Sequence, residues 1–389
     1  MKRQGDLGQT ESAVEPVTRN LIEPVVDKPR SGIGLCLSGG GYRAMLFHLG
    51  ALWRLNELGY LPKLDRISSV SGGSITAGVL GANWSNLRFN AVGVAQNFTE
   101  LIVAPLREIG MKTLDVPAVL LGLFLPGGPA RRLTSAYDRH LFAGSTLQDF
   151  PGRPRFVINA TNVQSGVLWR FSKPYMRDYR VGEVKNPIVP LATAVAASSA
   201  FPPVLSPLVL NLRGFAFTPL TGTDLQKEPY VTNAVLTDGG VYDNLGLETV
   251  WKEFDTVLVS DGGGQMEPQS KPHRDWVLHS VRVLNIIDNQ VRSLRKRQVI
   301  DSFKLGVRKG TYWGIRTNIA DYQLENAMVC PVDRTRGLAS LSTRLRSTGQ
   351  SLQERLINWG YAVCDAGMRR HVDAALPAPI RFPYHTVGV

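Results

Sequence analysis

The sequence predicts an α/β protein with a mainly parallel central sheet. Two segments, residues 33–59 and 66–80, each run from a short apolar stretch through a glycine-rich turn into a helical pattern. A third apolar stretch, residues 256–260, is typical of a strand buried on both faces. Repeated strand–turn–helix units indicate a parallel sheet, because each helix returns the chain to the starting end of the sheet.

The first unit is expected to place a strand at 33–38 and a helix at 42–59. Apolar side chains recur every three or four residues along that helix, at Met45, Leu49, Leu52 and Leu55. Gly59 is a typical helix end. In the second unit, residues 66–70 predict a strand, and a helix rich in small residues is expected to begin near Ser71.

The rest of the chain continues this alternation before turning helical. We expect a mostly helical region at 84–150, and then four further elements: strands at 156–159 and 167–171, a small-residue helix at 191–200 and the strand at 256–260. Long helical patterns cover 275–307 and 338–371. The predicted organisation is a flexible N-terminal arm, an α/β core and a helical C-terminal extension packed on the core, with bounds 1–30, 31–265 and 266–389.

Composition excludes several classes of protein. Of 389 residues, 43% are hydrophobic and 20% are charged, which is ordinary for a globular chain and not for a disordered or fibrous one. The first 20 residues are polar, and no apolar run approaches the ~18 residues of a membrane span. With only three scattered cysteines, a reducing compartment is expected, so the predicted location is cytoplasmic.

A glycine triplet, Gly39, Gly40 and Gly41, separates the first strand from the first helix. Glycines at such a junction leave backbone N–H groups free at a helix N-terminus, where they can bind a phosphate or the oxyanion of acyl transfer. The spacing fits neither nucleotide-binding glycine pattern. From these residues alone, a tight structural turn is as consistent as an oxyanion hole.

A candidate nucleophile lies in the second turn. Ser71 follows a strand and precedes Gly72 and Gly73, which approximates the Gly-x-Ser-x-Gly elbow that raises a serine above the end of a sheet. Ser69 stands where that pattern has its first glycine. A helix N-cap would also explain a serine at position 71.

A serine nucleophile needs a base. None of the six histidines has neighbours that mark it as one, and His48 in the first helix is expected to be a packed side chain. Two aspartates at predicted strand ends remain, Asp238 before two glycines and Asp261 before three. Spacing does not choose between them, and either one could belong to a simple Asp–Gly turn.

Four blocks in order carry a family resemblance: 38–43, 69–73, 197–203 and Asp238-Gly-Gly with Asn244. They resemble patatin-like phospholipases over roughly residues 31–265, and the first block is also similar to the cytosolic phospholipase A2 group. The resemblance implies a patatin-like three-layer α/β/α fold with a mainly parallel central sheet, in which 31–265 is the catalytic core.

The resemblance also implies the roles of individual residues. Ser71 would attack a fatty acyl ester, and Asp238 would act as its base in a Ser–Asp dyad without histidine. Gly39, Gly40 and Gly41 would supply oxyanion donors. Arg43 would hold that loop or stabilise nearby negative charge. Asp261 would be a structural carboxylate, and no cofactor or metal would be needed.

Two surface features bear on partners. The apolar segment 116–125 predicts a lid, an interfacial anchor or an interior helix.

Residues 271–309 carry ten basic and three acidic side chains, which is much of the chain's net charge of +12. An anionic membrane surface suits this stretch and would make the protein peripheral at the membrane. A solvated helix face is the alternative, and no nucleic-acid motif accompanies the charge.

The leading interpretation is therefore a lipid acyl hydrolase of the phospholipase A or lysophospholipase type, acting on a phospholipid or another fatty acyl ester. A second interpretation is an effector that stays inactive until a nucleotide or partner protein orders the site, with the basic stretch holding an anionic activator or an oligomer contact. A third is a binding module that keeps only the fold.

Overall fold

The computed structural model describes residues 29–114, 128–264, 266 and 268–389. The apolar segment 116–125 and nearly all of the predicted arm at 1–30 lie outside the described residues.

The strands are β1 (Arg30–Leu37), β2 (Arg66–Val70), β3 (Arg155–Asn162), β4 (Val167–Phe171), β5 (Tyr175–Asp178), β6 (Gly182–Lys185), β7 (Leu208–Asn211), β8 (Phe217–Thr218), β9 (Asn233–Asp238), β10 (Phe254–Asp261) and β11 (Lys309–Gly314). The α-helices are α2 (Gly41–Glu57), α3 (Gly72–Ala82), α4 (Ala104–Gly110), α6 (Gly128–Tyr137), α7 (Leu191–Ser198), α8 (Gly240–Asp243), α9 (Glu248–Trp251), α10 (Trp276–Lys304), α11 (Val332–Ala339) and α12 (Gln350–His371).

The described strands form one mixed sheet in the order β11-β10-β1-β2-β3-β4-β5-β6-β8, and β9 pairs with both β3 and β7. The strands from β11 to β3 run parallel, as predicted for the centre of the sheet. The strands beyond β3 pair antiparallel. Strand β11 lies within the predicted helical extension, yet it extends the central sheet beside β10.

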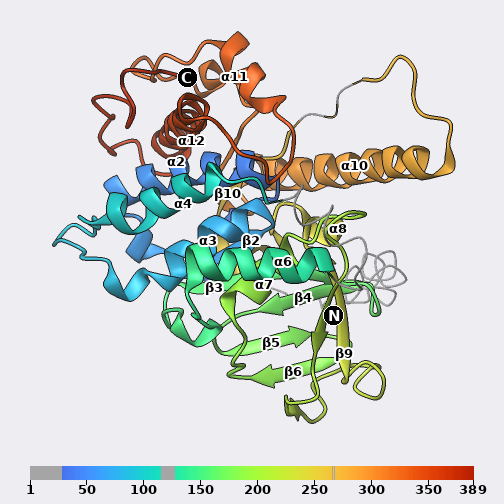
Figure 1. The fold of residues 1–389 in the computed structure, drawn as a ribbon. Coiled ribbons are helices and arrows are strands. Elements are labelled where there is room, and N and C mark those ends of the chain that lie inside the picture. The colour runs from blue at the N-terminus through green and yellow to red at the C-terminus, as the bar shows by residue number, and fades with distance from the viewer. Residues whose placement is uncertain (1–28, 115–127, 265, 267) are drawn as a thin grey trace, which may run out of the picture.

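Alternating side chains of the central strands belong to two separate hydrophobic cores, because successive residues of a strand point to opposite faces. In β1, Leu35 and Leu37 join the large core, while Cys36 joins a smaller core on the other face. Helices α2, α3 and α7 cover the first face, and α9 and α10 cover the second (Figure 1). The three-layer α/β/α prediction is confirmed.

The C-terminal helix α12 lies against α2 (Figure 1). Two glycines let the helices cross closely: a Cβ on Gly50 would lie 1.9 Å from the carbonyl oxygen of Ile357, and a Cβ on Gly360 would lie 1.9 Å from that of Phe47. Helix α2 begins at the glycine triplet, so α12 supports the element that carries it.

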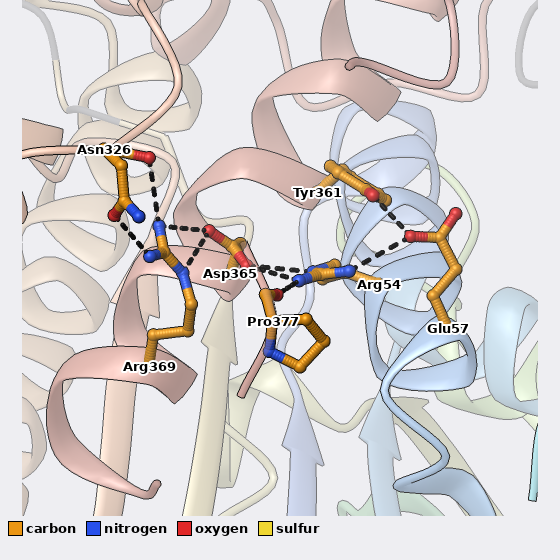
Figure 2. Close-up of polar contacts among 7 residues, drawn as sticks. All are labelled: Arg54, Glu57, Asn326, Tyr361, Asp365, Arg369 and Pro377. Carbon is orange, nitrogen blue, oxygen red and sulfur yellow. Dashed lines mark hydrogen bonds and ion pairs between the residues drawn. The ribbon is translucent and has the colours of Figure 1, made fainter. Parts of the chain in front are cut away.

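A buried ionic network fixes the same contact (Figure 2). Asp365 of α12 accepts hydrogen bonds from Arg54 Nε of α2 and from Arg369 Nε, each at 2.9 Å. Arg54 also donates to Glu57, and Tyr361 donates to Glu57 from the facing helix. Breaking a buried pair of this kind typically costs about 3–5 kcal/mol, so the network holds α12 firmly on α2.

One predicted helix is wrong in extent. The pattern over 338–371 predicts one continuous helix, but the structure has α11, then a non-helical segment at 340–349, then α12. That segment is rich in serine, threonine and glycine, which favour turns over helix. It passes over the start of α2, where Tyr42 N–H donates to the Arg344 carbonyl at 3.1 Å. None of the described helices is both long and apolar enough to cross a bilayer.

Candidate active site

Strand pairing brings Ser71 and Asp238 together. Val70, the last residue of β2, pairs with Asn159 of β3, while Asp238, the last residue of β9, pairs with Ala160. Strand β4 occupies the other edge of β3 here, so β2 and β9 share one edge and approach from opposite directions. The two strands therefore end facing each other, with Ser71 directly after one and Asp238 at the tip of the other.

Ser71 sits on a strained turn. Its backbone has φ 50° and ψ −119°, a combination that a non-glycine residue adopts rarely and that a nucleophile elbow requires. Its side chain makes no N-cap hydrogen bond to α3, so capping does not explain the serine. Ser71 is only 9% exposed.

The end of α7 positions both strand ends. Ser198 Oγ accepts a hydrogen bond from the Ser71 N–H at 3.0 Å and donates to the Asn159 carbonyl at 2.6 Å. The Asp238 N–H donates to the Ala200 carbonyl at 2.9 Å. The block 197–203 appeared in the sequence only as part of a family pattern, and no spacing indicated that Ser198 holds the turn.

Asp238 is a buried carboxylate with one oxygen unoccupied. The Gly240 N–H donates to Oδ1 at 2.7 Å, and Oδ2 makes no hydrogen bond with any described residue. Burial raises the pKa of Asp238 to about 7, against the lowering effects of the Gly240 N–H and the Ser71 hydroxyl. The hydroxyl is thus close enough to affect the carboxyl but short of an ordinary hydrogen bond, which is common in ligand-free sites.

The glycine triplet lies against this pair. A Cβ on Gly39 would be 3.2 Å from Ser71 Cβ and 2.4 Å from Asn244 Oδ1. The Gly39 N–H donates to the Asn244 carbonyl at 3.0 Å, so it is engaged within the protein. Gly40 and Gly41, with φ of 142° and 59°, have N–H groups without an acceptor among the described residues.

The two turns approach so closely that one further glycine is essential. A Cβ on Gly72 would lie 2.1 Å from the Gly41 carbonyl oxygen, and no side-chain movement relieves a backbone clash. We expect Gly72→Ala to cost about 1–3 kcal/mol of stability and to lower kcat/KM for the ester hydrolysis that the sequence predicts by about 100-fold, because the turns must separate. Thermal unfolding and ester hydrolysis measure both effects.

The control for this prediction is Gly214→Ala, because a Cβ on Gly214 meets nothing within 4 Å. It should leave both quantities unchanged. A Gly72→Ala protein with normal stability and activity would contradict the close approach of the turns.

Arg43 lies beside the glycine loop and is hydrogen-bonded to two neighbouring segments. Its Nε donates to the Gly262 carbonyl at 3.1 Å, and its Nη1 donates to the Leu341 carbonyl. A Cβ on Gly40 would be 3.2 Å from its Nη2. Burial and the nearby Arg292 lower the pKa of Arg43 to about 10. These contacts fix the Arg43 side chain beside Gly40, and its role in holding the loop stays a prediction.

His48 and Asp261 have all their polar atoms engaged elsewhere. His48 Nδ1 lies 2.8 Å from Ser260 Oγ and Nε2 lies 2.9 Å from the Ser38 carbonyl, and burial lowers the pKa of His48 to about 4. Asp261 accepts from the Tyr312 hydroxyl at 2.6 Å and from the Gly263 N–H at 2.8 Å. Both are packed structural groups, which leaves Asp238 as the candidate base.

Among the described residues, no group of three or more His, Cys, Asp or Glu side chains is placed to hold a metal ion.

Comparisons with known proteins identify the family of the chain. The family profile described as "Patatin-like phospholipase" matches residues 35–251. A "Phospholipase B" of Cryptococcus neoformans var. grubii is 33% identical over 99 residues, an alignment that spans 22% of this chain and only 16% of that relative.

Two solved structures are similar at lower identity. VipD from Legionella pneumophila has a TM-score of 0.38 at 15% identity, with 92% of this chain and 73% of that chain covered. Human GIVD cytosolic phospholipase A2 in complex with methyl gamma-linolenyl fluorophosphonate has a TM-score of 0.48 at 14% identity, with 86% and 57% covered. The profile match alone covers more than half of the chain, and the chain belongs to the patatin-like phospholipase family.

Proposed function

We propose that this protein is a lipid acyl hydrolase of the phospholipase A or lysophospholipase type, with Ser71 as nucleophile and Asp238 as general base. The observation that carries the proposal is the meeting of β2 and β9 on one edge of β3, with a carboxylate oxygen at the end of β9 that accepts no hydrogen bond from any described residue. Membership of the patatin-like family supports a fatty acyl ester as the substrate.

In the first half of the reaction, Asp238 Oδ2 takes the proton of the Ser71 hydroxyl as Oγ attacks the ester carbonyl carbon. The carbonyl oxygen becomes an oxyanion, and the Gly40 and Gly41 N–H groups are its proposed donors. Arg43 and the Gly39–Asn244 hydrogen bond keep that loop in place. When the intermediate collapses, the lysolipid oxygen leaves with the proton from Asp238, and the acyl group stays on Ser71.

In the second half, water replaces the alcohol. Asp238 takes a proton from the water as it attacks the acyl-serine carbonyl, and the same donors stabilise the second oxyanion. Collapse breaks the bond to Oγ, and the proton on Asp238 returns to the serine. The products are a free fatty acid and a regenerated Ser71 hydroxyl.

A fluorophosphonate probe tests the nucleophile directly. We expect the probe to phosphonylate Ser71, because the buried base activates this hydroxyl alone, and peptide mass spectrometry would locate the adduct. The companion measurement is release of fatty acid from phosphatidylcholine and lysophosphatidylcholine. An adduct on another serine, or no adduct on a folded protein that hydrolyses esters, would contradict the assignment.

One observation also supports the activated effector as a second candidate. Ser71 and Asp238 are 9% and 3% exposed, so a lipid chain reaches them only after neighbouring segments move. A nucleotide or partner protein that binds the open form would then raise activity. High hydrolysis of vesicle phospholipid by the purified protein alone would rule out a required soluble activator.

A further inference from the structure

Helix α10 extends beyond the body of the protein (Figure 1). Its C-terminal part is anchored: Val299 is fully buried in the smaller core, and Ile300 and Phe303 pack against that core. From Trp276 to Leu294, by contrast, no described side chain is buried. A helix of 29 residues thus leaves most of its length exposed on one side.

That exposed side is apolar. We call Trp276, Val283, Leu284, Ile287, Val291 and Leu294 the apolar stripe. Their exposed fractions range from 39% to 82%. From Leu284 onward they follow each other at intervals of three or four residues, so they lie on one face of the helix. A row of exposed apolar side chains of this kind usually marks an interaction site.

Basic side chains lie at both ends of the apolar stripe. Lys271 and Arg274 are exposed just before α10, and Arg297 and Lys304 are exposed on it. Asp275, which caps α10 by accepting the Leu278 N–H at 2.8 Å, and Asp301 are the exposed acidic residues between 268 and 304, so the four exposed basic residues leave a net positive charge. The surface around the stripe is therefore cationic and complements an anionic one.

A second copy of the chain fits this surface less well. In a two-fold contact each patch meets itself, so one surface of net positive charge would face another. An anionic phospholipid surface accepts both features at once, because apolar side chains enter the acyl boundary and cations remain among the headgroups.

The inner face of α10 connects the helix to the candidate active site. Arg292 Nη2 donates to the Gly264 carbonyl at 2.6 Å, in the loop that Arg43 also contacts. Arg295 Nη1 donates to Glu248 Oε1 at 2.8 Å, and its Nε lies 3.9 Å from Asp243 Oδ1, a few residues beyond Asp238. A surface bound to α10 would therefore lie beside the catalytic end of the sheet.

We propose that α10 docks on an anionic phospholipid surface, with the apolar stripe inserted at the acyl boundary and the flanking cations on the headgroups. Docking requires no chemistry at Ser71, so this inference goes beyond the proposed hydrolase and is tested separately from it.

The test uses the full-length chain with Ser71→Ala, so that vesicles stay intact during the measurement. Binding is compared on phosphatidylcholine vesicles with and without phosphatidylglycerol. We expect binding to need the anionic lipid, and the double substitution Leu284→Ser with Ile287→Ser to weaken it by about tenfold or more. Arg297→Glu with Lys304→Glu should weaken it as well and reduce its dependence on salt.

The matched control is Val329→Ser with Ile380→Ser, which removes two apolar side chains that are 81% and 100% exposed and belong to segments other than α10. It should bind like the parent. Unchanged vesicle binding by the stripe variant would overturn the proposal. So would a parent protein that is dimeric by light scattering and becomes monomeric in the stripe variant without losing lipid binding, because the stripe would then serve a second copy.

Failure of docking can be told apart from failure of the proposed hydrolase. In the chain with Ser71 intact, the stripe variant should hydrolyse a short, soluble p-nitrophenyl ester at the parental rate, since the stripe lies outside the site. Vesicle binding by a protein that hydrolyses no ester would support the docking of α10 and contradict the proposed hydrolase activity.

Discussion

Ser71→Ala and Asp238→Asn are each expected to lower kcat/KM for a p-nitrophenyl acyl ester by about four orders of magnitude or more. Without Oγ there is no acyl-enzyme, and with an amide at 238 no group accepts the serine proton. The double variant should lose little more than either single one, because the two residues act as one unit. Steady-state kinetics with circular dichroism as a folding check would measure the effect.

Asp261→Asn is the matched control, because Asp261 is also a buried carboxylate at a strand end before glycines. Both of its oxygens already accept hydrogen bonds from Tyr312 and Gly263, so the change should lower thermal stability but keep far more activity than Asp238→Asn. The reverse result, with Asp238→Asn active and Asp261→Asn inactive, would move the base to Asp261.

The parallel half of the fold could be predicted because its signals are local. Strand β2 has the predicted bounds, 66–70, and α2 begins one residue before the predicted start. In each of the two strand–turn–helix units, 33–59 and 66–80, an apolar stretch, a glycine-rich turn and a helical pattern lie within about 25 residues of one another. Patterns of this length can be recognised in a single sequence.

The antiparallel half could not be predicted so well. Strands β5 to β8 are two to four residues long, and several are apolar only at alternate positions or less. Strand β11 lies between two helical segments and is a strand because β10 offers it an edge. Such elements depend on tertiary pairing, and local propensity describes them poorly.

The candidate site, like the fold, has parts that local sequence predicts and parts that depend on tertiary pairing. Sequence pattern singled out Ser71 and left Asp238 and Asp261 as alternatives. The choice depends on which strand reaches the edge of β3 beside β2, and that register is set by pairing between residues about 80 positions apart. The hydrogen bond from the Ser71 N–H to Ser198 joins segments 127 residues apart, so no local motif could have indicated it.

Activity is expected to depend strongly on pH. Burial raises the pKa of Asp238 to about 7, and a general base works only when it is deprotonated. The pH profile of kcat/KM should therefore rise through about pH 7 and level off above it. Between about pH 8 and about pH 5 the ionised fraction falls by roughly 100-fold, and activity should fall with it. An ordinary aspartate would hold its activity down to about pH 4.

The same raised pKa predicts how stability responds. A carboxyl group that is harder to ionise when folded favours the folded state at low pH, and this contribution is lost as pH rises from about 4 to about 7. Asp238→Asn removes the buried charge, so its Tm should exceed that of the parent at about pH 8, by more than at about pH 5. An inactive Asp238→Asn protein with a higher Tm would identify Asp238 as a group kept for chemistry at the expense of stability. An activity profile that is flat from about pH 5 to about pH 8, in a protein that stays folded, would exclude Asp238 as the base.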